Sequence, residues 1–522
     1  MDLNRICLSL VSIHCLWILF QRPGWVWGIK LLSVLGLLGG MWFYDRERMG
    51  LIAVGPWIGL ILLPMILQRA ALRWLRTRRL RMALIATWVL RVLHPVKTSL
   101  VMNRWIRVIQ HLYRLELDPA RQLMRTLNVR DHSLDVWLQL IELQQRGAWE
   151  EIETWVDGQW VESGEAHVIL IGAKLNSLAE RGDWPMFVNV IGSLPSGDHN
   201  DQLRLRALAL WGDREGVRAL LRSHGDEFPR ESHLFWQAVA RLNSHDRDAA
   251  RVQLERLRRE ASPLLRLEID RRLTVPLSPS SDAVLTSPQH AMMQELRQYV
   301  GHEARYAVLS GTAGHWAVMT WLIMGGLLAA YGWGVRDGWD QGVNEDRLAE
   351  LGALIVPVEP GLDEWWRIFT YALLHFGPLH LAMNLLGMYY LGRRVERGCG
   401  PLGVLVCFIA SVGLAGYAIV RWPVLTLTED GGPAILVGAS GGVMGMMGML
   451  LGMLWVGRRT LPTERLRSQF ATAAQLVMMQ TLIDVSTPQI SAPCHLIGVA
   501  TGCVCGVLYG WAIREPVRPT VS

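Results

Sequence analysis

The residues best suited to chemistry lie in a short glycine-rich stretch, Gly438-Ala439-Ser440-Gly441-Gly442. This stretch opens the apolar segment 440–456, which is long enough to cross most of a bilayer core. Flanking glycines let other groups approach the Ser440 hydroxyl and backbone N–H closely. Ser440 is therefore a candidate nucleophile, and a serine nucleophile needs a base within hydrogen-bond reach.

The candidate base is His495, which precedes the apolar segment 496–513. Glycines follow at positions 498, 502, 506 and 510, and small residues at this spacing line one helix face. Because His495 lies three and seven residues before Gly498 and Gly502, it shares that face. This helix can approach the helix that begins at Ser440 closely, so we expect the two reactive side chains to meet within the membrane.

Another apolar segment begins with the polar sequence His375-Phe376-Gly377-Pro378-Leu379-His380-Leu381-Ala382-Met383-Asn384. Pro378 suits the first turn of a helix. His380 and Asn384 are four residues apart and therefore share one helix face. Polar residues at membrane depth are costly and indicate a functional site. An imidazole and an amide facing Ser440 would stabilise an oxyanion, and the Ser440 backbone N–H would be a further donor.

Composition indicates a membrane protein with more than one domain. The chain has 522 residues, enough for two or three domains, and 51% of them are hydrophobic while 19% are charged. The apolar residues form blocks, and many of the 24 tryptophans lie at block edges, where interfacial anchors are found. Arginines next to these blocks explain the net charge of +6 as positive-inside topology, so we expect no nucleic-acid partner.

The cysteines do not form a metal-binding or disulfide pattern. None belongs to a CxxC pair, and we interpret them as small apolar residues. The seven are Cys7, Cys15, Cys399, Cys407, Cys494, Cys503 and Cys505.

Residues 1–68 are predicted to form N-terminal transmembrane segments. The blocks 25–43 and 51–67 can each span a bilayer, whereas 6–20 is at the short limit and its placement stays open. The N-terminus lacks a clear small-residue cleavage site, so we expect a retained anchor. Six arginines between 69 and 81 place that side in the cytoplasm, although a basic lipid-binding arm is also compatible.

Residues 69–275 are predicted to hold this basic segment and a cytoplasmic α-helical repeat domain. A motif recurs every 30–35 residues as Gly147-Ala148-Trp149, Gly182-Asp183-Trp184, Gly212-Asp213-Arg214 and, more faintly, His245-Asp246-Arg247. The period fits stacked helical hairpins and resembles tetratricopeptide-like repeats. A surface that docks a protein partner is the favoured interpretation, and an irregular helical domain without a dedicated partner is the alternative.

A Pro/Ser-rich linker is predicted at 276–310, with a short polar helix around 292–299. Residues 311–515 then hold six candidate spans, and 516–522 form a tail. The spans are 316–333, 379–391, 402–420, 440–456, 470–482 and 496–513. Arginine clusters follow the second, fourth and sixth spans, which places Ser440 and His495 near the non-cytoplasmic side.

These residues together resemble the rhomboid intramembrane serine proteases, over residues ~315–515. The matching motifs occur in order and with consistent topology. They are Trp366-Arg367, His375-x4-His380-x3-Asn384, Tyr390-Leu391-Gly392-x2-Val395-Glu396, Gly438-x-Ser440-Gly441 and His495-x2-Gly498-x3-Gly502.

The resemblance implies an all-α, polytopic membrane protein with a six-helix rhomboid core. Ser440 would be the nucleophile and His495 the base, without a third acidic member. His380, Asn384 and the Ser440 N–H would form the oxyanion hole, with Trp366, Gly438, Gly441, Gly498 and Gly502 as structural support. Arg367 and Glu396 would hold the long loop after the first span. The implied substrates are single-span membrane proteins, in a plasma or inner membrane, with lipid as surroundings and no metal or cofactor.

Some positions leave alternatives open. The family often has an aromatic residue four positions after the serine, where this chain has Met444. Asp484 could orient His495, but a helix-end acid is more often interfacial or capping, and we favour that interpretation. His375 is interpreted as a loop-structuring residue. A non-catalytic rhomboid-like protein that binds membrane clients is the alternative function.

Overall fold

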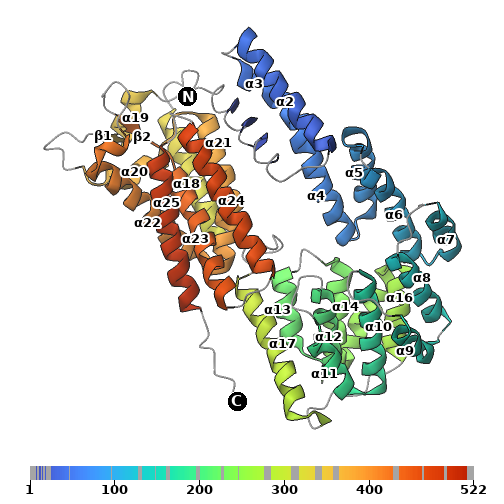
Figure 1. Ribbon diagram of the computed structural model, residues 1–522. Coiled ribbons are helices and arrows are strands. Elements are labelled where there is room, and N and C mark those ends of the chain that lie inside the picture. The colour runs from blue at the N-terminus through green and yellow to red at the C-terminus, as the bar shows by residue number, and fades with distance from the viewer. Residues whose placement is uncertain are drawn as a thin grey trace. The chain divides into compact units, whose positions relative to one another are not determined.

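The computed structural model is predominantly helical (Figure 1). It describes residues 25–45, 48–95, 97–126, 132–146, 148–159, 165–194, 200–224, 228–244, 246–274, 284–306, 317–335, 344–356, 364–426, 434–460, 464–486 and 491–513, together with positions 7, 8, 11, 12, 14, 15 and 18. The predicted tail 516–522 and most of the block 6–20 lie outside these residues.

The chain divides into two units, one formed by 1–57 with 312–522 and the other by 58–311. The predicted N-terminal spans are helical. They comprise α2 (Trp25–Tyr44), α3 (Met49–Trp57), a π-helical turn at Ile58–Leu62, and α4 (Leu63–Arg76). These elements form two helical segments, Val26–Tyr44 and Ile52–Leu75, and each is long and apolar enough to cross a membrane.

The second unit, called the helical unit below, begins with the π-helical turn and α4, and its other described elements are also helices. They are α5 (Leu80–Leu93), α6 (Lys97–Tyr113), α7 (Leu117–Arg125), α8 (His132–Gln145), α9 (Trp149–Asp157), α10 (Glu165–Arg181), α11 (Trp184–Gly192), α12 (Asp201–Trp211), α13 (Arg214–His224), α14 (Arg230–Leu242), α15 (Arg247–Glu260), α16 (Pro263–Thr274) and α17 (Ser287–Tyr306).

The recurring Gly-Asp motif has a structural explanation in this unit. Gly212 ends α12 with φ +86°, a left-handed conformation that favours glycine. The next residue, Asp213, accepts a hydrogen bond from the Gly216 N–H at 2.8 Å and so caps α13. Asp183 caps α11 in the same way through the Met186 N–H. The motif therefore ends one helix and begins the next.

The short polar helix expected around 292–299 within the linker is the longer helix α17, and it is docked in the second unit rather than part of a free linker. Its apolar face, formed by Met293, Leu296 and Val300, is buried in the core of the helical unit. Arg297 also forms an ion pair with Asp213, at 2.6 Å. The apolar residues of α17 recur at helical spacing, so they form one face. This face packs against α11 and α13. The Pro/Ser-rich residues before α17 lie mostly outside the described part of the chain.

The C-terminal region contains the predicted spans. Its elements are α18 (Val318–Gly334), α19 (Glu345–Leu351), β1 (Leu354–Val356), α20 (Arg367–Thr370), a 3₁₀ turn at Tyr371–Leu373, α21 (Pro378–Gly387), a π-helical turn at Met388–Gly392, α22 (Arg393–Arg421), a 3₁₀ turn at Pro423–Thr426, β2 (Ala434–Leu436), α23 (Ser440–Thr460), α24 (Glu464–Ser486) and α25 (Ala492–Ala512).

Three helical segments here are apolar and long enough to span a membrane: Pro378–Arg421, Ser440–Arg459 and Ala492–Ala512. The first is 44 residues long and breaks at Gly400, where φ is +75°. It therefore supplies two predicted spans. Helix α18 is apolar but shorter, and α24 is long enough but more polar. Together with the N-terminal spans, these helices make the chain a multi-pass membrane protein.

A small antiparallel sheet is the element that the sequence analysis did not anticipate. In it β1 pairs with β2, with Leu354 opposite Leu436. Strand β2 ends four residues before Ser440. The pairing therefore ties the long loop after α18 to the segment that leads into the candidate nucleophile.

Candidate active site

Ser440 is the first residue of α23 and is partly exposed. The turn before it depends on Gly438, whose φ of +125° disfavours other residues. The Gly438 N–H donates to the backbone carbonyl of Tyr371 at 2.9 Å. Tyr371 is fully buried, and its hydroxyl donates to the Val412 carbonyl at 3.1 Å. A buried side chain thus anchors the turn that presents the serine.

Helices α23 and α25 meet backbone to backbone along their glycines. A Cβ atom at Gly498 would overlap the Gly441 carbonyl, and one at Gly502 would overlap the Gly445 carbonyl. At Gly506 it would meet the carbonyl of Met449. The glycine stripe therefore faces the serine-bearing helix, and this pair is the most extensive among the described elements.

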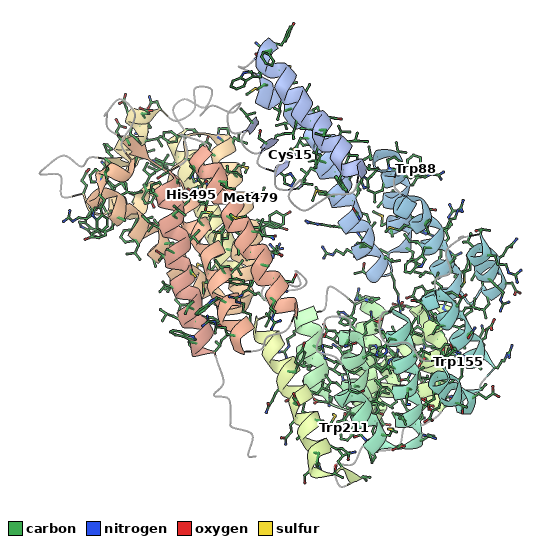
Figure 2. The ribbon with its side chains drawn as sticks, in the orientation of Figure 1. Cys15, Trp88, Trp155, Trp211, Met479 and His495 are labelled. Carbon is green, nitrogen blue, oxygen red and sulfur yellow. The ribbon has the colours of Figure 1, made fainter. Side chains whose placement is uncertain are left out.

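This seam brings the segments around Ser440 and His495 together. Gly441 follows the serine directly, and a Cβ there would lie 3.0 Å from the Cys494 sulfur, beside the histidine. His495 is 7% exposed and lies within the helical bundle (Figure 2). Ser440 and His495 thus lie at the same end of two tightly packed helices.

The interpretation of Asp484 as an interfacial or capping residue is wrong. Its side chain is buried, and its Oδ2 lies 2.8 Å from the His495 Nδ1. A capping residue would bond backbone groups at a helix end, whereas this carboxylate faces a side chain of the next helix. The expectation that no third acidic residue accompanies His495 is therefore also corrected.

The predicted oxyanion residues lie near the serine turn. A Cβ at Gly438 would lie 2.7 Å from Cε1 and 2.8 Å from Nε2 of His380, so the ring fits against this glycine. Asn384 is buried, and its amide nitrogen donates to the His380 carbonyl at 3.0 Å, which leaves one amide hydrogen for another acceptor.

Trp366 and Arg367 hold the loop after α18. The Arg367 guanidinium donates to the backbone carbonyls of Ala349 at 2.7 Å and Ala353 at 2.8 Å. Its charge also lies over the Trp366 ring, 4.9 Å from the ring centroid. A Cβ at Gly352 would overlap this tryptophan, so the loop and the ring pack closely. Through β1 and β2, the same loop supports the approach to Ser440.

Part of the chain is similar to known proteins. Residues 362–512 match the family model described as Rhomboid domain. The chain contains a rhomboid domain. A related protein is the rhomboid protease GlpG of Enterobacter sp. (strain 638), 31% identical over 153 residues. The match covers 29% of this chain, and the chain spans about half (51%) of that relative's length.

In the part of the chain that the structure describes, Glu396 of the rhomboid domain contacts the start of α18 rather than the loop that follows this helix. Its buried carboxylate accepts hydrogen bonds from the backbone N–H groups of Met319 at 2.9 Å and Thr320 at 2.8 Å. It therefore satisfies first-turn donors of α18, where a negative charge also complements the helix dipole.

Sequence reasoning missed two further polar residues of the rhomboid domain, besides undervaluing Asp484. Tyr371 lies on a short 3₁₀ turn without a motif, and Gln480 lies one turn before Asp484 and donates a hydrogen bond to its carboxylate.

His375 is buried and packs edge-on to His380, with ring centroids 5.0 Å apart. Burial and this neighbour lower the pKa of His375 to about 3, so its ring is neutral. Met444 is buried within α23.

Proposed function

We propose that the chain is an intramembrane serine protease. Its rhomboid domain would cleave peptide bonds in or near the membrane-spanning segments of single-span membrane proteins. Ser440 acts as nucleophile and His495 as general base. The observation that carries this proposal is the glycine seam, because it joins the two segments that bear these side chains backbone to backbone.

The reaction proceeds through an acyl-enzyme. The Ser440 oxygen attacks the scissile carbonyl carbon while its proton moves to the Nε2 of His495. The tetrahedral intermediate collapses when His495 returns this proton to the leaving amine. Water then attacks the ester carbon while His495 takes a proton from it, and His495 passes this proton to the Ser440 oxygen as the new carboxylic acid is released.

Negative charge on the carbonyl oxygen requires donors that are in place before the reaction. We assign this role to His380, to Asn384 and to the backbone N–H of Ser440. The free amide hydrogen of Asn384 and the approach of His380 to Gly438 support this assignment.

The test is labelling of the full-length chain in membranes with a fluorophosphonate that reacts with activated serines. We expect wild type to label at Ser440, and Ser440→Ala and His495→Ala not to label. A single-span reporter substrate should be cut by wild type alone. If the wild type does not label and does not cut the reporter, the protease proposal fails.

The orientation follows from the basic residues. Arg458 and Arg459 occupy the last turn of α23, at the opposite end from Ser440. The positive-inside rule assigns that end to the cytoplasm. We therefore propose an inner or plasma membrane location, with the active site near the non-cytoplasmic side and the helical unit in the cytoplasm.

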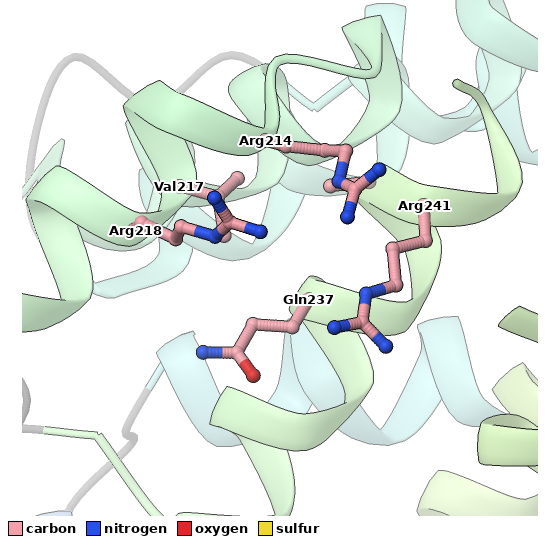
Figure 3. A pocket seen from close by; sticks show the side chains of 6 residues that line it. Arg214, Val217, Arg218, Gln237 and Arg241 are labelled. Carbon is pink, nitrogen blue, oxygen red and sulfur yellow. The ribbon is translucent and has the colours of Figure 1, made fainter. Parts of the chain in front are cut away.

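For the helical unit we propose a docking role toward acidic segments of substrates or partner proteins. A cavity of about 70 Å³ is lined by Arg214 and Arg218 of α13 and by Gln237 and Arg241 of α14 (Figure 3). Asp246 forms an ion pair with Arg214, at 3.7 Å. The excess positive charge fits an acidic side chain.

This docking role predicts that the cytoplasmic tail of a substrate affects its cleavage. A reporter with an acidic tail should be cleaved faster than the same reporter with a neutral tail. Arg218→Glu should remove the difference while leaving cleavage of the neutral-tail reporter unchanged. Equal cleavage of both reporters by wild type would contradict the docking role but not the protease proposal.

A further inference from the structure

Asp484 is a buried carboxylate in a helix of a membrane domain. It is 3% exposed, and both of its oxygens have partners within the protein. Oδ1 accepts a hydrogen bond from the side-chain amide of Gln480 at 2.8 Å. Oδ2 lies 2.8 Å from the Nδ1 of His495. The three side chains thus form a continuous chain from α24 to α25.

The local structure of α24 gives no stabilisation to an acid at this position. Asp484 lies two residues before the end of α24, where the helix dipole is negative and disfavours a carboxylate. Burial of a charge among apolar helices is also costly unless it is paired and hydrogen-bonded. The contact with His495 therefore accounts for the position of this carboxylate, and Gln480 fixes its orientation.

The contact has a chemical consequence for the base. When the carboxylate accepts a hydrogen bond from Nδ1–H, the imidazole is held in the tautomer whose Nε2 lone pair is free. This nitrogen is the one that takes the Ser440 proton in the proposed reaction. The negative charge then stabilises the imidazolium, while the carboxylate itself stays unprotonated.

We propose that Asp484 is the positioning residue of the base, so that Ser440, His495 and Asp484 act as a triad rather than a serine–histidine pair. Gln480 orients the carboxylate. This inference rests on the proposed protease function. It adds an acid that acts through His495 and does not touch the substrate.

The test compares variants in the full-length protein, using the fluorophosphonate labelling rate and cleavage of the reporter. Asp484→Asn keeps the size of the side chain but removes the charge. We expect kcat and labelling to fall on the order of 100- to 10,000-fold with little change in KM. Asp484→Glu should restore part of the rate. Val485→Ala, at the adjacent exposed position, is the matched control and should label like wild type.

A second readout separates positioning from folding. In the wild type, ¹⁵N NMR of His495 should show a single tautomer protonated at Nδ1, and in Asp484→Asn a mixture. Thermal unfolding of each variant detects general destabilisation. If Asp484→Asn is destabilised, Asp484→Glu is compared with wild type instead.

Three results would overturn the inference. The first is wild-type labelling by both Asp484 variants. The second is a fall in rate matched by a rise in KM with the tautomer unchanged, which would indicate a structural role. In both of these cases wild type still labels at Ser440, so the protease proposal survives. The third is a wild type that does not label, which would overturn both the triad inference and the protease proposal.

Discussion

At the residue scale, the reactive side chains depend on very small neighbours. Gly438 leaves room for the His380 ring, and Gly441 and Gly498 let the backbones beside Ser440 and His495 touch. A larger residue at any of these positions would displace a reactive group without changing its chemistry. In such sites a shift of about 1 Å can cost about 100-fold in rate.

The proposed nucleophile and base should behave as one unit. Ser440→Ala and His495→Ala should each reduce reporter cleavage to about a thousandth or less, and the double variant should be no worse. Their expression and membrane insertion should match wild type. Retention of a tenth of the wild-type rate by Ser440→Ala, under conditions limited by chemistry, would remove the assignment.

Loss of one oxyanion donor should be milder. Asn384→Ala should lower kcat by about 10- to 1000-fold, since His380 and the Ser440 N–H remain. The fall should appear in kcat rather than KM, which steady-state kinetics with the reporter would measure. An effect confined to KM would instead place Asn384 in substrate binding.

The close approach of the helices that carry Ser440 and His495 was predictable from the sequence, because a glycine stripe indicates both a helix face and a close contact. Asp484 was not, because it lies on a different helix from His495 and only the packing of α24 against α25 brings them together. The partner of Glu396 was missed for the same reason. Its contact with α18 joins positions that lie 76 and 77 residues apart.

At the element scale, the seam between α23 and α25 positions the site. Both helices approach so closely that even a methyl group at Gly502 would overlap the Gly445 backbone. This geometry makes even alanine damaging at Gly502.

Gly502→Leu should insert into the membrane normally yet lose labelling and cleavage, because α25 must move away from α23. Gly502→Ala should show a smaller loss in the same direction. Val504→Leu adds bulk to the exposed face of the same helix and should label like wild type. Labelling of Gly502→Leu at the wild-type rate would show that the seam does not position His495.

The start of α18 provides a separate test of Glu396. Glu396→Ala leaves the Met319 and Thr320 N–H groups unpaired within the protein, and should lower the free energy of unfolding by about 2 kcal/mol. Glu396→Gln should lose less, because its carbonyl oxygen can still accept. Denaturation in detergent measures both variants, and an unchanged stability of Glu396→Ala would contradict the capping role.

At the scale of the whole molecule, the helical and membrane units have separate cores. The helical composition and the two sets of spans were predictable from hydrophobic blocks and periodicity. The three-residue strands were not, because runs this short carry no recognisable alternation. The docking of α17 was also missed, since its apolar positions reveal a buried face but not which unit covers it.

This division predicts which truncation folds. A chain that begins at about residue 312 loses residues 1–57 of the same unit but keeps the whole rhomboid domain, and it should therefore insert and cut the reporter. A chain that begins at about residue 285 keeps α17 without its core and should aggregate, because Met293, Leu296 and Val300 become exposed. Size-exclusion chromatography and labelling would distinguish them. A soluble but inactive 312–522 chain would mean that earlier residues assemble the site.

The order of the helices along the chain has a consequence for biogenesis. The serine emerges from the ribosome on α23, before α24 and α25, and 78% of the most apolar stretch of α23 is buried in the finished protein. Until α25 has been synthesised, the glycine face of α23 meets lipid or another chain, and no base stands beside the serine. A nascent or prematurely terminated chain that stops before His495 should therefore lack the proposed protease activity, because the proposed site is assembled only when α25 arrives.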